Sequence, residues 1–401
     1  MSLIDSSCRV AIAAFLHDLG KLAERSGIFR QHPSLDAHKT TYCPYKSEGR
    51  YFTHVHAAHT ALALDDIEEF LPDLLYGDTS PFCGRVMSGD AGQQSATDSL
   101  INAAAKHHKP ETFLQWVIAT ADRVASGFER EEFDRYNLAS DENTERKLNH
   151  YTTRQLTLFE QIRLNGSEPV ESSLQYRYAL KPQAPANIFP VLAKNCEKHD
   201  DTNARNEYAK LWQDFKQGLA QIPRSHRHNI PMWLDHFDSL WLTYTHAIPA
   251  ATAFGVKPEV SLYDHSRTTA ALATALWRWH EAFGQTDSAA AQVLKDRSDF
   301  AKQKFLLVQG DFFGIQDFVF ANGGETNKHA AKLLRGRSFQ VSLFTEIAAL
   351  KLLDDLGLPP TSQIINAAGK FLIVAPNTSE TCAALEAARK VFDTWFLNNT
   401  F

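Results

Sequence analysis

Histidine and aspartate residues recur along residues 1–130 in numbers that can bind metal ions. The pair His17-Asp18 follows an apolar stretch, and the further candidates are His56, His107, His108 and Asp122. Imidazole nitrogens and carboxylate oxygens are ligands of first-row divalent cations. Two such ions about 3.5–4 Å apart activate a water molecule and hold both oxygens of an in-line phosphoester displacement. The pattern therefore predicts one or two metal ions and hydrolysis of a phosphate ester.

Each of these residues also has an explanation that involves no chemistry. Because the chain has 17 histidines in 401 residues, a His-Asp dipeptide by itself is a weak signal. The pair His107-His108 could end a helix in solvent, and Asp122 could cap a helix or pair with Arg123 or Arg130. The combination, rather than any single member, indicates a metal centre.

The first candidate pair is expected at the end of an apolar helix. Ser6 or Ser7 can cap the start of this helix, and Gly20 is suited to stop it. Adjacent side chains on a helix point about 100° apart, so His17 and Asp18 would reach one metal ion from two sides.

Later helices carry the remaining candidates. Within residues 53–64, His56 and His59 lie at i and i+3 and share one helix face. We expect His59 and the nearby His54 to be surface or supporting residues rather than ligands. His265 heads an Ala-rich helix and could be a metal ligand or, with Asp264, a helix-capping pair. Helices are expected within residues 11–21, 53–64, 100–110, 113–127, 205–222 and 259–283.

From Lys304 onward the apolar pattern changes its period. Residues 305–311 predict a strand, and residues 363–376 predict two strands around Ala367-Ala368-Gly369. Helices are expected over residues 330–356 and 378–397. The order β-α-β-β-α matches a ferredoxin-like unit that lacks its last strand, because the chain stops where that strand should follow. Asp311 is expected to be a turn or cap residue.

The composition bounds the protein class. The net charge is −6, so any nucleic-acid contact must come from a local patch. Lys328, Lys332, Arg335 and Arg337 could form such a patch, or only a solvated helix face. The five cysteines are dispersed without a Cys-x-x-Cys motif, which argues against a zinc knuckle or disulfide framework and suits a reducing cytoplasm. No apolar run is long enough to span a membrane, and no signal-peptide pattern is found.

Several motifs together resemble the large subunit of type III-A (Csm-type) CRISPR–Cas effector complexes. They span nearly the whole chain in the order of that family, and the last two are the most specific. The motifs are Leu16-His-Asp-Leu-Gly-Lys21, Ala-Asp-Arg-Val-Ala-Ser-Gly at 121–127, Ser261-Leu-Tyr-Asp-His-Ser-Arg267, Gly310-Asp-Phe-Phe-Gly-Ile-Gln-Asp-Phe318 and Ala331-Lys-Leu-Leu-Arg-Gly-Arg-Ser338.

The resemblance implies an α+β fold with a circularly permuted, all-helical HD domain followed by a ferredoxin-like first palm domain. The HD domain would occupy residues 1–140, its helical remainder and a linker residues 141–300, and an incomplete palm residues 301–401. In the family, the HD domain cuts single-stranded DNA with transition-metal ions. The resemblance also implies that Lys21, unless it is an exposed helix-end lysine, acts with His17 and Asp18 in catalysis and contacts a scissile phosphate. The implied metal ligands are His17, Asp18, His56, His107, His108, Asp122 and His265.

The second half of the sequence departs from the family pattern. Family members are usually longer and carry a second palm with a Gly-Gly-Asp-Asp motif that makes cyclic oligoadenylate from ATP. Here Asn322-Gly-Gly-Glu325 lacks the paired acids, and the zinc-binding cysteines expected between the palms are absent. The usual Gly-Gly-Gly hairpin reads Ala367-Ala368-Gly369, and the added methyl groups would crowd a backbone that approaches ATP. We therefore expect neither cyclase activity nor ATP binding from this chain alone, which would be a truncated protein or half of a split subunit.

The combined prediction is a single-strand-specific DNase of a CRISPR antiviral ribonucleoprotein, with Mn²⁺, Ni²⁺, Co²⁺ or Mg²⁺ as cofactor. The expected partners are other Csm-type subunits, crRNA and target RNA through the complex, the single-stranded DNA substrate, and a second chain that carries the Gly-Gly-Asp-Asp palm. Two alternatives stay open. One is an HD phosphohydrolase acting on nucleotides, and the other is a nuclease-silent scaffold that docks Csm subunits and the crRNA.

Overall fold

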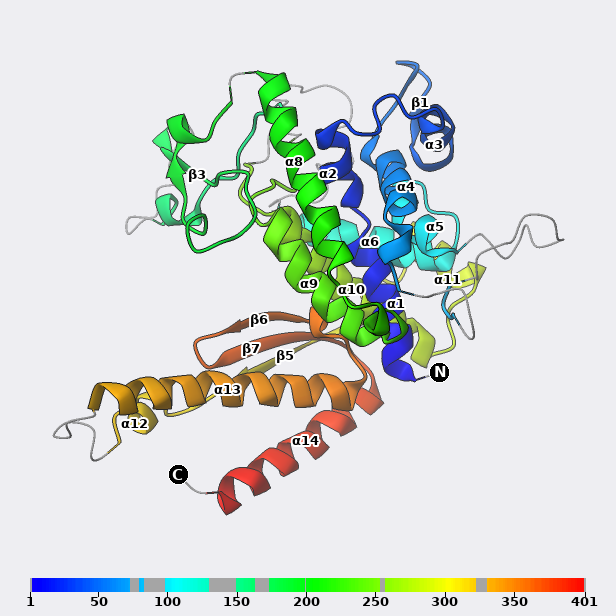
Figure 1. The fold of residues 1–401 in the computed structure, drawn as a ribbon. Helices are drawn as coiled ribbons and strands as arrows, with labels where there is room; N and C mark the ends of the chain where they lie inside the picture. Colours follow the sequence, from blue (N-terminus) through cyan, green and yellow to red (C-terminus); the bar gives the residue numbers. More distant parts are fainter. Residues whose placement is uncertain are drawn as a thin grey trace.

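A body of helices packs on one face of a small β-sheet in the computed structural model, and a long helix lies on the other face (Figure 1). The chain is therefore mixed α and β, as the sequence predicts. None of the described helices is both long and apolar enough to cross a membrane. The structure describes residues 2–72, 79–82, 98–129, 149–162, 173–198, 200–252, 257–321 and 330–399.

The helical body runs from the N-terminus to α11, with two short hairpins on its surface (β1 with β2, and β3 with β4). Its strands are β1 (Tyr45–Lys46), β2 (Tyr51–Phe52), β3 (Tyr176–Arg177) and β4 (Val191–Leu192). Its helices are α1 (Leu3–Phe15), α2 (Leu19–Ser26), α3 (Leu35–Tyr42), α4 (His56–Asp66), α5 (Leu100–Ala105), α6 (Phe113–Glu129), α8 (Asp201–Ala220), α9 (Ile230–Thr245), α10 (Leu262–Ala282) and α11 (Ser288–Asp296).

Helix α1 lies at the centre of the body, since every residue from Ser6 to Phe15 is buried. Helix α10 packs along both α1 and α6, and α2 packs against α4 and α8. The start of α1 differs from the prediction. The side chain of Ser2 caps the helix by accepting a hydrogen bond from the backbone N–H of Asp5 at 3.3 Å, whereas Ser6 and Ser7 lie inside it. The helix therefore begins before the apolar run on which the prediction relied.

The role predicted for Gly20 is also wrong. Helix α1 ends at Phe15, before the His17-Asp18 pair, and Gly20 lies in the first turn of α2. A Cβ at Gly20 would lie 1.9 Å from the carbonyl oxygen of His56 and 2.5 Å from the backbone nitrogen of Thr60. Glycine is therefore required here because α2 crosses α4 at backbone contact, not because a helix must stop.

Helix α10 also joins the helical body to the sheet. The Arg278 guanidinium donates hydrogen bonds to the carbonyl oxygens of Leu356 and Gly357 at 3.3 and 3.0 Å, and to the Ser7 hydroxyl at 3.0 Å. Since Leu356 is the last residue of α13, the arginine from α10 satisfies carbonyl groups that this helix end leaves without partners.

The sheet has the strand order β5-β7-β6, with both pairs antiparallel. Phe371 and Ile373 of β7 pack with Ala349 and Leu353 of α13, whereas Val374 faces the core of the helical body. The order β-α-β-β-α and this pairing agree with the ferredoxin-like unit predicted from the sequence. The elements are β5 (Phe305–Asp311), α12 (Ile315–Val319), α13 (Ala330–Leu356), β6 (Gln363–Ala367), β7 (Lys370–Pro376) and α14 (Ser379–Asn398).

Three predictions for charged and turn residues of this unit have different outcomes. Asp311 is the last residue of β5, and its carboxylate lies 3.0 Å from the Lys370 ammonium, so it is a strand residue rather than a turn or cap. Arg337 donates hydrogen bonds to the carbonyl oxygens of Val319 and Ala321, which ties α12 to α13 instead of forming an open basic face. Lys328 and the segment 322–325 lie outside the described residues.

The hairpin between β6 and β7 places an alanine in an unfavourable backbone conformation. Ala368 has φ +54° and Gly369 has φ +78°, as in a two-residue turn with both residues left-handed. We expect Ala368→Asn to raise the free energy of unfolding by about 1 kcal/mol, because this conformation costs alanine roughly 1–2 kcal/mol and costs asparagine less. Urea denaturation measures the change.

Ala367→Gly is the matched control because Ala367 lies in β6 and gains nothing from the freedom of glycine. It should lower stability by roughly 0.5–1 kcal/mol. Equal midpoints for Ala368→Asn and the parent protein would show that the turn carries no strain.

Candidate metal centre

Two histidines reach the centre from the ends of helices in the same way. His17 follows the end of α1 and His107 follows the end of α5. The Nδ1 of His17 lies 2.6 Å from the carbonyl oxygen of Ala14, and the Nδ1 of His107 lies 2.8 Å from that of Ala104. A carbonyl only accepts, so each Nδ1 carries the hydrogen and each Nε2 keeps a lone pair available to a cation. The carbonyl ends of two helices also favour a positive charge nearby.

An inner group of side chains surrounds one oxygen of Asp18. The Asp18 Oδ2 lies 3.3 Å from the Nε2 of His17 and 3.3 Å from the Nε2 of His265. The Oδ1 of Asp122 lies 3.5 and 3.1 Å from the same two nitrogens. We call His17, Asp18, Asp122 and His265 the inner group. It joins the α1–α2 link, α6 and α10, which are far apart in the sequence.

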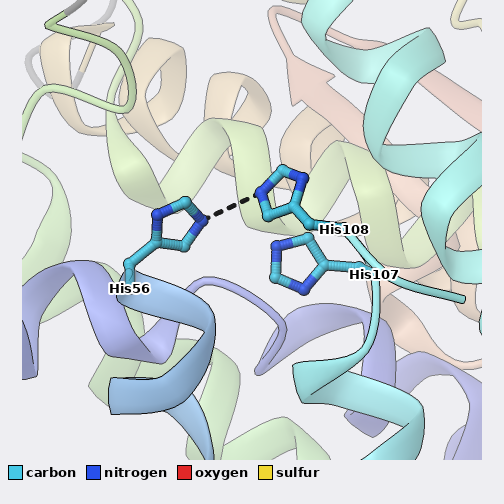
Figure 2. Close-up of side chains that lie close together, drawn as sticks. All are labelled: His56, His107 and His108. Atoms are coloured by element: carbon cyan, nitrogen blue, oxygen red, sulfur yellow. Dashed lines mark hydrogen bonds between the residues drawn. The ribbon is translucent and has the colours of Figure 1, made fainter. Parts of the chain in front are cut away.

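An outer group surrounds the other oxygen of Asp18. The Asp18 Oδ1 lies 3.3 Å from the Nε2 of His56 and 3.9 Å from that of His107. The Nε2 of His108 lies 3.0 Å from the Nε2 of His56, so three imidazoles face one another (Figure 2). We call Asp18, His56, His107 and His108 the outer group. Asp18 thus belongs to both groups, one oxygen facing each.

Both carboxyl groups are ionised despite their burial. Asp18 is 1% exposed, and burial by itself would raise its pKa, but the Lys21 and His17 charges hold the pKa well below its usual range. Burial likewise opposes ionisation of Asp122, and the neighbouring His17 and His265 lower its pKa. Burial would lower the pKa of His17, yet the two carboxylates raise it. The inner group therefore keeps two ionised carboxylates, whose negative charge requires a positive charge beside them.

The outer imidazoles are neutral at pH 7. Burial lowers the pKa of His107 to about 4, and it lowers the pKa of His56 and His108 well below the usual range. Neutral imidazole is the form that binds metals, because protonation removes the lone pair.

The buried atoms fit a divalent metal ion. The Nε2 of His17, the Oδ1 of Asp18 and the Nε2 of His107 are buried and form no hydrogen bond with any residue that the structure describes. Each buried polar atom without a partner lowers the stability of the folded protein by roughly 1–3 kcal/mol if nothing replaces the water that it loses. Three of them cluster at one point, and imidazole with carboxylate is the donor set that Mn²⁺, Co²⁺, Ni²⁺ or Zn²⁺ accepts.

Lys21 is held inside the centre rather than exposed at a helix end. Its ammonium lies 2.5 Å from the Oδ2 of Asp18 and donates a hydrogen bond to the carbonyl oxygen of Ala250 at 2.9 Å. Its side chain is 19% exposed. Its contact with a scissile phosphate stays a prediction, but the charge already lies at the Asp18 carboxylate.

The remaining histidines and aspartate near the centre lie in different environments. His59 is buried with its ring 6.4 Å from that of Phe29, so it is a core histidine outside both groups. The ring of His54 contacts His108, with centroids 3.9 Å apart. Asp264 bonds with the capping Ser261, as the Ser261 Oγ lies 2.6 Å from the Asp264 carboxylate, whereas His265 turns into the inner group. The capping-pair alternative for His265 is therefore wrong.

Thr60 holds the His17-Asp18 segment against α4. Its hydroxyl donates to the carbonyl oxygen of His17 at 2.8 Å and accepts from the N–H of Gly20 at 3.0 Å. Both bonds are buried and span about forty residues of sequence, so they fix where Asp18 stands relative to His56.

We expect Thr60→Val to lower the free energy of unfolding by about 2 kcal/mol, because a buried N–H and a buried carbonyl lose their partner without a change of side-chain shape. Chemical denaturation measures the loss, and a Mn²⁺ titration should show weaker binding. Thr274→Val is the control, since that hydroxyl bonds only to Ala270 within α10. Equal effects of the two substitutions would contradict the role of Thr60.

Sequence reasoning did not find Thr60, Ala14 or Ala104 as supports of the centre. A signal exists for the last two: the pattern Ala-x-x-His occurs at 14–17 and again at 104–107, each followed by a further candidate ligand. No sequence signal identifies Thr60, because its partners become neighbours only when α2 crosses α4.

Known proteins resemble the chain along its whole length. A family model described as Csm1 subunit domain B matches residues 304–401. A Methanocaldococcus jannaschii protein named CRISPR system single-strand-specific deoxyribonuclease Cas10/Csm1 (subtype III-A) is 26% identical over 306 residues, or 72% of this chain and 35% of that protein. The protein of the same name from Mycobacterium tuberculosis is 32% identical over 152 residues, or 38% of this chain and 18% of that protein.

Solved structures agree with these relatives. The crystal structure of a Csm1–Csm4 cassette in complex with one ATP matches 98% of this chain with a TM-score of 0.57 at 22% identity. The chain thus resembles Cas10/Csm1, the large subunit of type III-A CRISPR systems. The crystal structure of Csm1 in T. onnurineus matches 99% of the chain with a TM-score of 0.53 at 21% identity. The chain spans 35% of the length of the M. jannaschii Cas10/Csm1 protein and 43% of the T. onnurineus Csm1 chain.

Proposed function

We propose that this Cas10/Csm1-type chain is a metal-dependent single-strand DNase of a type III-A CRISPR effector complex. The observation that carries the proposal is the position of Asp18, whose two oxygens face the inner and the outer group. One carboxylate between two sets of nitrogen and oxygen donors is the arrangement that a pair of metal ions needs. The names of the relatives support single-stranded DNA as the substrate.

We further propose the division into an HD domain over residues 1–140, its helical remainder over 141–300 and a palm domain over 301–401. Two observations support it. His265, from the middle segment, completes the inner group that residues of the first segment begin. The match to Csm1 domain B begins at residue 304, close to the proposed start of the palm domain at residue 301.

In the proposed mechanism, the inner and outer groups would hold one divalent ion each. Bound ions supply a hydroxide near neutral pH and neutralise charge on the phosphate. The chain itself contributes the orientation of its donors. Backbone carbonyls fix the imidazoles of His17 and His107, Asp18 would offer one oxygen to each group, and the Lys21 ammonium places a positive charge beside the carboxylate. Burial of the inner group keeps bulk water from weakening these interactions.

The proposed partners follow the family. The structural relatives include Csm1–Csm4 cassettes, which supports assembly with other Csm subunits and, through them, with crRNA and target RNA.

A substrate panel tests the proposal. Labelled single-stranded DNA, duplex DNA, single-stranded RNA and nucleoside triphosphates are incubated with the protein and Mn²⁺, Co²⁺, Ni²⁺ or Mg²⁺, alongside His17→Ala/Asp18→Ala. We expect cutting of single-stranded DNA that the double variant lacks. Turnover of nucleotides without DNA cutting would establish the nucleotide phosphohydrolase instead. Absence of both, with no ion bound in metal analysis, would favour the scaffold.

A further inference from the structure

The histidines of the two groups differ in how their rings are held. Hydrogen bonds to backbone carbonyls fix the rings of His17 and His107. His108 has no such bond in the described part of the chain; its only hydrogen bond there joins its Nε2 to the Nε2 of His56 at 3.0 Å. Ligand histidines usually need a second partner that fixes the ring orientation. Something other than a carbonyl must therefore orient His108.

Ring contacts are the remaining support of His108. The ring of His54 lies over it with a centroid distance of 3.9 Å and an interplanar angle of 36°. The ring of His107 contacts it at 4.1 Å and 50°. His107 is itself fixed by Ala104, so it cannot follow a movement of His108. The ring of His56 meets it edge-on at 4.9 Å. Among these three contacts, His54 alone is not itself in the proposed ligand set.

His54 is held in a conformation that its surroundings must enforce. Its φ is +52°, in the left-handed region that residues other than glycine rarely adopt. Its carbonyl oxygen accepts hydrogen bonds from the N–H of Ala57 at 2.9 Å and from the Cys43 thiol at 3.5 Å, and its Nδ1 lies 3.1 Å from the Thr53 hydroxyl. Strained backbone of this kind persists where neighbouring contacts over-determine it and often lies beside functional sites.

We propose that His54 is a positioning residue of the outer group: its ring holds the imidazole of His108 so that the Nε2 faces His56. This rests on the proposed function, because it assumes that the outer group binds a metal ion. His54 donates no ligand atom in this role. The contact of the rings, rather than hydrogen bonding by His54, is what the outer group requires.

Cobalt titration tests this role without measuring catalysis. The absorption of bound Co²⁺ reports the number and geometry of ligands, and calorimetry counts the ions. His108→Ala identifies the absorption component of the outer group. Asparagine tolerates the left-handed backbone at position 54 but has no ring. We therefore expect His54→Asn to lower the affinity of the outer group for Co²⁺ about tenfold. His54→Phe keeps a ring and should retain outer binding within about threefold, which separates the ring contact from loss of an imidazole.

His38→Asn is the matched control. His38 also stacks on an aromatic ring, that of Tyr42 at 5.8 Å, but lies on α3 away from both groups, so its loss should change neither ion. Circular dichroism establishes that each variant is folded. If His54→Asn binds both ions as tightly as the parent protein does, His54 does not position His108. Should His54→Phe lose the outer ion as His54→Asn does while folded, the ring contact is not what matters. A parent protein that binds no Co²⁺ would instead refute the proposed metal centre itself.

Discussion

Asp18→Asn is expected to reduce cleavage of single-stranded DNA more than about 100-fold, beyond what loss of a supporting residue costs a metal site. The physical reason is the position of the carboxylate. One amide cannot supply the negative charge that both groups share, and its NH₂ would point a donor at the Nε2 of His17 or His56. Metal analysis after dialysis against Mn²⁺ should show that the protein binds fewer ions at both groups.

Asp311→Asn provides the comparison for Asp18→Asn. It also neutralises a carboxylate that faces a lysine, but this residue lies at the end of β5 in the sheet unit. Cleavage should stay within about threefold of the parent protein, because no donor of the centre is touched. If Asp18→Asn also kept its cleavage rate within about threefold of the parent protein, the Asp18 carboxylate would not serve both groups.

Gly20→Ala is expected to give the largest loss of stability, about 3 kcal/mol in the free energy of unfolding, at the upper end of what forcing extra volume into a packed contact costs. The added Cβ would lie 1.9 Å from a carbonyl oxygen and 2.5 Å from a backbone nitrogen of α4, and neither atom can turn away. Helix α2 must therefore move from α4. The same movement separates Asp18 from His56, so outer-group metal binding should weaken as well. Guanidinium denaturation and a Co²⁺ titration measure the two effects.

Gly336→Ala is the control for Gly20→Ala. Gly336 lies inside α13, and a Cβ there meets nothing within 4 Å. Alanine in a helix interior should raise stability by up to about 1 kcal/mol. Opposite signs for these two Gly→Ala substitutions are expected; a Gly20→Ala protein as stable as the parent would show that α2 and α4 can separate at no cost.

The sequence predicts the members of the centre better than it predicts their support. Histidine and aspartate types, together with the family resemblance, select the seven candidate ligands that the structure brings together, because donor chemistry is a property of the side chain. The position of Asp18 between the two groups could not be predicted in this way, because it depends on how α1, α4, α6 and α10 converge. Gly20 shows the same limit: its local pattern resembles a helix stop, whereas the deciding contact is with a backbone forty residues away.

The sheet unit was accessible to sequence reasoning because its signals are local. The change of apolar period at Lys304 and the turn at Ala368-Gly369 mark strands that the structure contains. The predictions of Ser6 or Ser7 as the helix cap and of Asp311 as a turn or cap residue were wrong for the opposite reason. The position of a helix cap depends on where the helix begins, and the end of a strand depends on where its partner strand ends. Both are set by contacts with other segments rather than by the local sequence.

Helix α10 connects the candidate metal centre to the sheet unit. Its first turns carry His265 into the inner group, and further along Arg278 binds the end of α13. Under the proposed function, a partner that binds the sheet unit and displaces α13 would also displace α10 and His265, and would so change the metal affinity. Thermodynamic linkage makes this effect reciprocal, so metal loading would change the affinity for that partner by the same factor.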